Sequence, residues 1–453
     1  MNIAFGFPAL VFLIVSLALR VASAPTADLS YFLLAIYALL GRIQVVQALA
    51  LSWLFSMLNP SLVPDASLAS ADRYLVIVAT VLSVVWRMKG RGVIFSIQRL
   101  SLLTLCMGLF ILLHSFLFSS VVDVSVLKVM SWVTVVLTLL SAWQGLLFVQ
   151  REALSNQLQH GLIMIVLLSL PLLIVPDVGY FRNGSGFQGV LSHPQSFGPT
   201  VALLGVLVGG RIMGSEKPAW RDMALLVTCF VLVVLSEART AGVALVLGLL
   251  GSMLLSPMFA GLSRRRMLPG LRSRRLQAVI LMISVAIFVA SPLLVSKLSN
   301  FIFKRSETTS LVAAADASRG ELVAKMLSNI QKYPLTGIGF GIASEPEYME
   351  VERDPVLGLP LSAVVEKGVM PIALAEELGA IGALVVFGWF LVVLRRGARS
   401  GVSQFAVVIT VLLVNLGESM FFSVGGMGML LLIMLTAAVT SEQSTPRQVA
   451  SHV

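Results

Sequence analysis

Apolar runs of about 20 residues recur from one end of the chain to the other, separated by short polar connectors. They are continuous and rich in Leu, Val and Ile, without the alternating segments of about 10 residues that mark an outer-membrane barrel. A helix of that length crosses a hydrocarbon core of about 30 Å. The pattern predicts an all-α fold, a polytopic integral membrane helix bundle of about 12–14 spans. After residue 60 the predicted spans are 72–88, 99–119, 124–149, 158–176, 197–212, 220–236, 239–257, 276–296, 373–394, 402–423 and 425–441.

The first 60 residues are harder to divide into spans. Residues 5–21 form one apolar run, and Ala22-Ser23-Ala24 after it resembles a signal-peptidase site. No Lys or Arg precedes that run, and Pro25 would follow the cut, so we interpret the run as a first span. Residues 30–58 are too long for one upright helix and contain polar interruptions, so they form either one tilted helix or a tight pair.

The composition excludes a water-soluble fold. Of 453 residues, 57% are hydrophobic and 12% are charged, against about 25% charged residues in an ordinary soluble domain. A net charge of +10 would suggest nucleic acid in a soluble protein, but here the informative quantity is the distribution of Lys and Arg between loops. Cys106 and Cys229 each lie in an apolar run, which favours packing roles over a disulfide or a metal site.

Three connectors carry clusters of Lys and Arg and no acidic residue, at 87–99, 264–275 and 395–399. If the spans alternate, all three lie on one side, which the positive-inside rule makes cytoplasmic. Polar and ionisable groups beside the spans then gather on the opposite, outer side, where we expect chemistry. These groups are Arg182, His193, Gln195, Glu237, Arg239, Arg319, Glu366, Glu376, Glu377 and Glu418.

One long segment interrupts the succession of spans. Residues 297–377 hold half of the chain's 22 acidic residues. We therefore divide the chain into a transmembrane bundle (1–296), a periplasmic loop (297–372), C-terminal spans (373–441) and a cytoplasmic tail (442–453).

The periplasmic loop contains a predicted amphipathic helix. Ser318-Arg319-Gly320-Glu321 has the form of a capping box, with Ser318 as N-cap and Arg319 in the first helical turn. Apolar residues follow at helical spacing from Leu322 to Ile330, and Tyr333-Pro334 ends the helix. Glycines at 337, 339 and 341 then predict a compact loop.

Three polar clusters on the outer side are candidate functional sites. They are Arg182–Phe187 with Ser192–Gln195, the hairpin Ser236–Thr240, and Glu366–Gly368 with Glu376–Gly379. Each cluster also has a purely structural interpretation. The first could be a solvated turn, the hairpin could be a Glu–Arg pair that ends two spans, and the third could be interfacial charge that anchors a helix end. The four histidines are scattered without metal-ligand spacing, so we predict no metal site and no cofactor.

The order of these features resembles the O-antigen ligase and O-antigen polymerase superfamily. The resemblance covers roughly residues 160–440 and rests on the Ser236–Thr240 hairpin, on Asp316–Arg319 followed by Pro334–Gly341, and on Glu377–Gly382. It implies glycosyl transfer on the outer face of a bacterial inner membrane. A glycan carried on undecaprenyl pyrophosphate would pass to a sugar hydroxyl without a metal, and the lipid pyrophosphate would leave.

The resemblance also implies roles for individual residues. Arg239 and Arg319 would hold the departing pyrophosphate, because arginine offers a bidentate fork to phosphate oxygens. The substrate-binding candidates are Arg182, His193, Gln195, Lys367 and Glu377.

The chain departs from the ligases at the start of the re-entry helix. Ligases of the superfamily carry a His-Asn pair there, whereas this chain reads Val364-Val365-Glu366-Lys367. Glu366 could supply the base that inversion at the anomeric carbon requires, with Lys367 tuning it. This difference favours a polymerase of exopolysaccharide or O-antigen repeat units over a ligase that transfers glycan to lipid A-core.

The implied partners are an undecaprenyl-pyrophosphate-linked glycan donor, a glycan or lipid-linked glycan acceptor, membrane lipid and other polysaccharide assembly proteins, but not nucleic acid. A lipid-linked oligosaccharide flippase is the alternative from another class, with its charges near the bilayer midplane between repeated halves. The chain shows no internal repeat, and its ionisable groups gather at the outer surface, which favours an enzyme. In a third alternative, a structural membrane protein, Arg239, Arg319 and Glu366 would be dispensable.

Overall fold

The computed structural model describes residues 7–64, 69–88, 98–180, 186–278, 281, 311–353, 358, 360–363, 365 and 367–441. In this part of the chain, six helices are long and apolar enough to cross a membrane. They are α5 (Arg99–Phe118), α6 (Val122–Gln144), α7 (Phe148–Ser169) continued by the 3-10 helix η3 (Leu170–Ile174), α9 (Pro194–Gly214), α11 (Arg239–Ala260) and α16 (Met370–Ser400). The predicted all-α polytopic membrane fold is confirmed.

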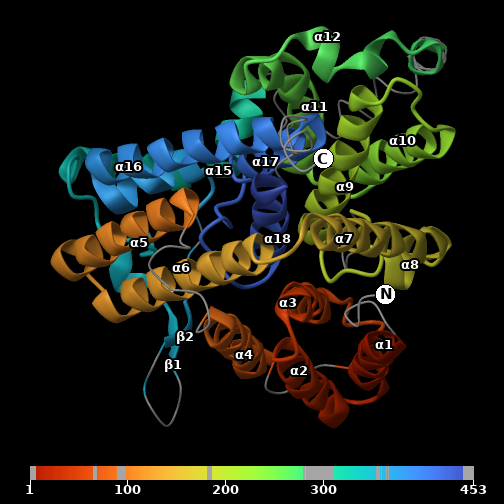
Figure 1. Cartoon of the computed structure of the whole chain (residues 1–453). Helices are drawn as coiled ribbons and strands as arrows, with labels where there is room; N and C mark the ends of the chain where they lie inside the picture. The colour runs from red at the N-terminus through yellow and green to blue at the C-terminus, as the bar shows by residue number, and fades with distance from the viewer. Residues whose placement is uncertain are drawn as a thin grey trace.

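The other elements are mostly shorter helices. These are α1 (Phe7–Ala22), α2 (Ala24–Ala38), α3 (Arg42–Met57), α4 (Ala69–Met88), α8 (Pro176–Gly179), α10 (Trp220–Leu235), α12 (Arg264–Met267), η4 (Pro269–Arg272), α15 (Leu311–Lys332), η5 (Pro346–Tyr348), α17 (Val402–Val414) and α18 (Met427–Thr440). An antiparallel hairpin of β1 (Val351–Arg353) and β2 (Pro360–Ala363) pairs Glu352 with Ser362. This hairpin projects from the bundle beside α6, and Arg353 forms an ion pair with Asp123 at the start of that helix (Figure 1).

Residues 30–58 form a tight pair of helices rather than one tilted helix. α2 ends at Ala38, and α3 begins at Arg42 after a turn. Polar contacts satisfy the glutamine within this apolar run, since Gln47 Oε1 accepts a hydrogen bond from Tyr37 Oη at 2.6 Å. Its Nε2 donates to Gln157 Oε1 of α7 at 2.8 Å. Such hydrogen bonds between helices stabilise packing where no water is available.

The predicted boundary between spans 124–149 and 158–176 is wrong. α6 ends at Gln144 and α7 already begins at Phe148, so the turn between them is only a few residues long. The hydrophobic pattern does not show this turn, because Leu146 and Leu147 within it are apolar. The first half of α7 is polar, so the hydrophobic pattern assigned it to the connector instead of to the helix.

The predicted span 402–423 is too long. α17 ends at Val414, and a loop of residues 415–426 follows. Asn415 organises this loop, because its Oδ1 accepts hydrogen bonds from the backbone N–H groups of Met420 at 2.9 Å and Phe421 at 2.8 Å. An asparagine that bonds to nearby backbone competes with helix continuation, even in an apolar stretch.

Aromatic packing fixes loop 415–426 to the bundle. Trp132 of α6 lies against Trp389 of α16 and against Phe421 and Phe422 of the loop, with ring centroids 4.9–5.9 Å apart. The Trp132 indole N–H also donates to the Phe421 carbonyl at 3.0 Å. Buried aromatic contacts of this kind give the loop a defined position, which matters because it lies between the two polar regions described below.

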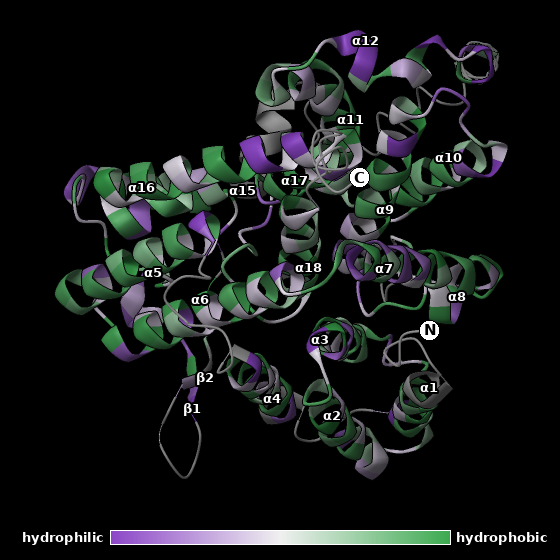
Figure 2. Cartoon of the chain, in the orientation of Figure 1, coloured by the Kyte–Doolittle hydropathy of each residue, from purple (hydrophilic) through white to green (hydrophobic). Residues whose placement is uncertain are grey.

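Arginine-rich connectors lie together at one end of the bundle. Leu268, beside the arginines of α12 and η4, is buried with Met213 near the end of α9 and Val402 at the start of α17. Residues 395–399 end α16 at the same place. Figure 2 shows hydrophobic residues along the helices and hydrophilic residues on α12 and at this end of α16. For these two connectors, the predicted common side is consistent with the structure; the third, 87–99, is only partly described.

The helix predicted in the long loop is present, but it begins earlier than expected. α15 starts by Leu311, so Ser318 is not an N-cap and Arg319 does not lie in the first turn. Three strong helix formers, Ala313-Ala314-Ala315, explain the earlier start. Glu321 pairs with Lys325 one turn further along, at 3.1 Å, instead of reaching back to free amides.

Candidate functional site

The N-terminal part of α16 is broken at Gly379, where φ is 65° and ψ is −178°. The break redirects backbone hydrogen bonds into the loop that follows α15. Ala380 N–H donates to the Pro334 carbonyl at 2.9 Å, and the Glu376 carbonyl accepts from Ile338 N–H at 2.9 Å. Backbone groups released by a helix break must find partners in an apolar environment, and this loop supplies them.

The loop after α15 approaches the α16 backbone so closely that some of its positions require glycine. At Gly337, φ is 65°, and an added Cβ would lie 2.6 Å from the carbonyl oxygens of Glu376 and Glu377. At Gly379, an added Cβ would lie 2.1 Å from the Leu335 carbonyl oxygen. Only glycine combines the left-handed conformation with these contacts. The predicted compact loop is thus the partner of the helix break.

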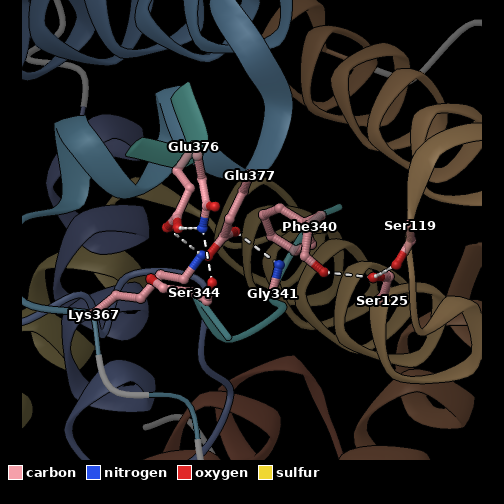
Figure 3. A network of polar contacts seen from close by, with 9 residues as sticks. Ser119, Ser125, Phe340, Gly341, Ser344, Lys367, Glu376 and Glu377 are labelled. Carbon is pink, nitrogen blue, oxygen red and sulfur yellow. Dashed lines mark hydrogen bonds and ion pairs between the residues drawn. The ribbon is translucent and has the colours of Figure 1, made fainter. Parts of the chain in front are cut away.

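A buried ion cluster consists of Lys367 and of Glu376 and Glu377, which directly precede the break in the chain (Figure 3). Lys367 Nζ is 2.8 Å from Glu376 Oε2 and 3.2 Å from Glu377 Oε1. The side chains of these residues are 2%, 0% and 7% exposed, respectively. Charges so far from water persist only when they are paired and hydrogen-bonded.

Neighbouring groups donate a hydrogen bond to the second oxygen of each carboxylate. Glu376 Oε1 accepts a hydrogen bond from Asn329 Nδ2 of α15 at 2.7 Å. Glu377 Oε2 accepts from the Gly341 backbone N–H at 2.7 Å (Figure 3). Lys128 of α6 is attracted to Glu377 and lies over the Phe340 ring, 5.6 Å from its centre. Two lysines and two glutamates therefore gather where α6, α15, the glycine loop and α16 meet.

A second polar region, the hairpin site, consists of His193, Ser236–Thr240 and Glu418. The first turn of α9 packs on the hairpin, since a Cβ added at Gly198 would lie 2.4 Å from Ala238 Cβ. Loop 415–426 packs on the start of α11, since a Cβ added at Gly417 would lie 2.0 Å from Thr240 Oγ1. The hairpin site lies at the starts of α9 and α11, opposite the arginine-rich ends of these helices.

Glu237 has the only positive φ, 54°, among the described residues other than glycine. A glutamate in this left-handed conformation costs free energy that the surrounding contacts must offset. Arg239, two residues on, is the first residue of α11. A cation at a helix N-terminus is unfavourable to the helix itself, and the free amides beside it favour an anion. The hairpin thus combines a left-handed glutamate with an arginine at a helix N-terminus.

His193 is the N-cap of α9. Its Nδ1 accepts a hydrogen bond from the Gln195 backbone N–H at 3.0 Å, so the ring is neutral at Nδ1. Burial lowers the pKa of His193 below its usual value, and the nearby Glu418 carboxylate partly opposes this. The interaction with Glu418 brings His193 and loop 415–426 into the same site.

The structure brings some of the predicted site residues together and leaves others undescribed. His193, Gln195 and Arg239 lie at the hairpin site, and Lys367 and Glu377 lie in the buried ion cluster. Loop 415–426 links the two regions, because Ser419 N–H donates to the Lys367 carbonyl at 3.2 Å. Arg182 and Glu366 lie outside the described residues, and only the backbone of Arg319, on α15, is described.

Sequence analysis missed Lys128 and Arg73, which lie on α6 and α4. Both carry a sequence signal, because a cation within an apolar span rarely lacks a role. Asn329 was also missed, since a polar residue on the exposed side of an amphipathic helix is ordinary.

Comparison with known proteins points in the same direction as these features. The family model described as O-Antigen ligase matches residues 224–361, which include the Ser236–Thr240 hairpin, α15 and the glycine loop. No curated protein matches the chain closely enough to count as a relative. This match confirms the resemblance to the O-antigen ligase and polymerase superfamily.

Proposed function

We propose that this protein is a membrane glycosyltransferase that polymerises undecaprenyl-pyrophosphate-linked repeat units of an exopolysaccharide or O-antigen. The observation that carries the proposal is the meeting of the Ser236–Thr240 hairpin, His193 and Glu418 within a chain that matches the O-antigen ligase family. This site lies opposite the arginine-rich connectors, so the positive-inside rule assigns it to the periplasmic face of the inner membrane.

The proposed reaction is a direct displacement at the anomeric carbon of the donor. An acceptor hydroxyl forms the new C–O bond, its proton passes to a base, and the bond from the anomeric carbon to the pyrophosphate oxygen breaks. Glu366 is the proposed base, on the strength of its place in the sequence and of the resemblance. Arg239 and Arg319 stabilise the negative charge that develops on the leaving pyrophosphate.

We assign a positioning role to Lys367 and Glu377, in place of direct substrate binding. Both are already engaged in the buried ion cluster, and its contacts hold the start of α16 against the glycine loop and loop 415–426. His193 and Gln195 remain candidates for contact with donor or acceptor sugars. The fixed cluster keeps the surrounding site in one geometry, which transfer between two large substrates requires.

A ligase that transfers glycan to lipid A-core is the second candidate function. The description of the matching family favours it. The sequence Val364–Lys367, which lacks the His-Asn pair of ligases, favours the polymerase. A flippase is the alternative from another class.

The first test uses cells that lack the protein. Undecaprenyl-linked glycans are extracted and sized beside the secreted and lipid A-linked polysaccharide. Single repeat units on the lipid at the periplasmic face, with no long chains, support a polymerase. Long chains retained on the lipid indicate a ligase, and single units confined to the cytoplasmic leaflet indicate a flippase.

The second test complements these cells with variants. Arg239→Ala should abolish polymer while the protein level in the membrane stays unchanged, and Arg239→Lys should restore only part of it, because a point charge cannot reproduce the bidentate fork. Arg221→Ala is the matched control, since Arg221 is an exposed arginine near the start of α10 at the opposite end of the bundle. Full-length polymer from the Arg239→Ala cells would refute the assignment of the site.

A further inference from the structure

A cavity of about 790 Å³ lies between α4, α6, β2 and loop 415–426. Its volume is in the range of small-molecule sites in proteins, and none of the described residues in its lining is acidic. The lining contains two cations, Arg73 of α4 and Lys128 of α6. The cavity is separate from the hairpin site, and nothing above assigns it a ligand.

The two cations suit an anion. Among the residues that the structure describes, the buried Arg73 Nε has no hydrogen-bond partner, and its guanidinium lies beside Gly425 and the Tyr74 ring. Lys128 Nζ lies over the Phe340 ring and is attracted electrostatically to Glu377. In the described part of the chain it forms no ion pair within 4.0 Å. Buried cationic groups with unused donors are strong ligands for phosphate oxygens.

The rest of the lining suits a hydrocarbon chain. Along α6 the lining runs from Val124 to Thr134, about 15 Å of helix, and includes Leu127 and Met130. Met130 is 52% exposed on the outer surface of this membrane-spanning helix. The cavity therefore reaches the lipid-facing side of the bundle, and a ligand with a long chain can extend from it into the bilayer.

The position of the cavity relates it to the candidate active site. Gly341 and Ser419 form part of its wall. Gly341 donates to Glu377 of the buried ion cluster, and Ser419 follows Glu418 of the hairpin site. A ligand in this cavity and a ligand at the hairpin site would thus lie on either side of loop 415–426.

We propose that this cavity binds the phosphorylated head of a second polyprenyl-pyrophosphate-linked glycan, the acceptor, with Arg73 and Lys128 on its phosphate oxygens. This inference rests on the proposed polymerase function, because a polymerase joins two lipid-linked glycans. The donor then occupies the hairpin site, and the glycan of the acceptor extends past loop 415–426 toward it. Each lipid tail leaves the bundle on its own side.

The experiment counts bound lipids by native mass spectrometry of the full-length protein, with undecaprenyl pyrophosphate as the probe. The wild-type protein should bind two lipids. Arg73→Gln should bind one, with the second weakened by about tenfold or more, because a charge-assisted hydrogen bond is lost. Arg239→Ala should also bind one, and the double variant none. Arg99→Gln, an exposed arginine at the start of α5, is the matched control and should bind two.

Two further variants keep the test independent of folding. Arg73→Lys should restore binding in part, and Ser131→Leu, which narrows the cavity without a change of charge, should also reduce the count to one. Two lipids bound to both Arg73→Gln and Ser131→Leu would overturn the inference. If only Arg239→Ala loses a lipid, the cavity proposal fails while the proposed function stands; if neither arginine variant loses one, both fail.

A competition experiment separates the two possible sources of a phosphate-bearing lipid. Phosphatidylglycerol is added in excess to the wild-type protein with undecaprenyl pyrophosphate bound. Retention of the second undecaprenyl pyrophosphate supports an acceptor site. Its replacement mole for mole by phosphatidylglycerol would mean that the cavity holds an ordinary anionic lipid, and the inference would be wrong.

Discussion

The ammonium group of Lys367 lies 2.8 Å from the Glu376 carboxylate, and both side chains are almost completely removed from solvent. Such a pair adds little net stability compared with an apolar pair, but removing one partner leaves a buried charge without compensation. The pair therefore acts as a constraint on position. It joins the chain segment before α16 to the part of α16 that precedes its break.

Lys367→Met should destabilise the protein by about 3–5 kcal/mol, because two buried carboxylates then face each other. Glu376→Gln should cost less, since Lys367 keeps Glu377 at 3.2 Å. Thermal unfolding of purified protein in detergent measures both. Lys325→Met is the matched control, because Lys325 also bridges two glutamates, Glu321 and Glu345, but at an exposed position. A larger loss for Lys325→Met than for Lys367→Met would contradict the buried cluster as described.

Gly379→Ala should destabilise the protein by at least about 1–2 kcal/mol, because φ is 65° and the new Cβ would overlap the Leu335 carbonyl. Gly388→Ala in the same helix should be neutral or stabilising by up to about 1 kcal/mol, since nothing lies within 4 Å of its Cβ position. The difference in melting temperature between the two variants checks the helix break. Equal melting temperatures would mean that α16 runs straight through residue 379.

Glu237→Gly should be more stable than Glu237→Ala by about 1 kcal/mol, because only glycine adopts a φ of 54° without cost. If the glutamate side chain serves the reaction, both variants should lose polymer to the same extent although their stabilities differ. Polymer length in complemented cells and melting temperature of the purified variants separate these effects. Normal polymer from Glu237→Gly would assign Glu237 a structural role only.

The stability that His193 contributes should fall as the pH is lowered. Burial lowers the pKa of His193 in the folded protein, so the unfolded chain binds more protons between the folded pKa and the unfolded value of about 6.5. The contribution is complete above that value and is lost as the pH falls through the folded pKa. The Nδ1 acceptor for Gln195 N–H is lost in the same step.

The comparison variant for this titration is His193→Asn, since asparagine accepts an N-cap hydrogen bond but does not titrate in this range. Melting temperatures measured from about pH 8 to about pH 5 should drop more steeply for the wild-type protein than for His193→Asn. Parallel curves would show that His193 is not buried as a neutral N-cap.

Several parts of the fold were predictable from local sequence. Runs such as 99–119 and 239–257 predicted α5 and α11 closely, because a span must satisfy its backbone hydrogen bonds internally and must be apolar along its length. The Pro334–Gly341 motif correctly predicted a compact loop after a helix. Its role as the hydrogen-bonding partner of the break in α16 was not predictable. The carbonyl groups that accept its hydrogen bonds belong to Glu376 and Glu377, about 40 residues away in the sequence.

Local sequence failed where a side chain or a neighbouring segment outweighed hydropathy. Asn415 ends α17 inside an apolar stretch, and Ala313–Ala315 extend α15 upstream of its apparent cap. The contacts of Lys367 and Glu377 also depended on distant partners. The sequence made both substrate-binding candidates, yet they pair with each other, and Glu377 also accepts a hydrogen bond from the Gly341 backbone.

The sequence by itself determined that this is an α-helical membrane protein, because each apolar run carries its own length and composition. The order of its polar motifs also showed the resemblance to the O-antigen ligase and polymerase superfamily. Tertiary structure alone decided which charges are buried together, where α16 breaks, and that Arg73 and Lys128 line one cavity. The physical reason is that burial and ion pairing depend on what other helices bring within a few ångströms, and hydropathy contains no information on which helices become neighbours.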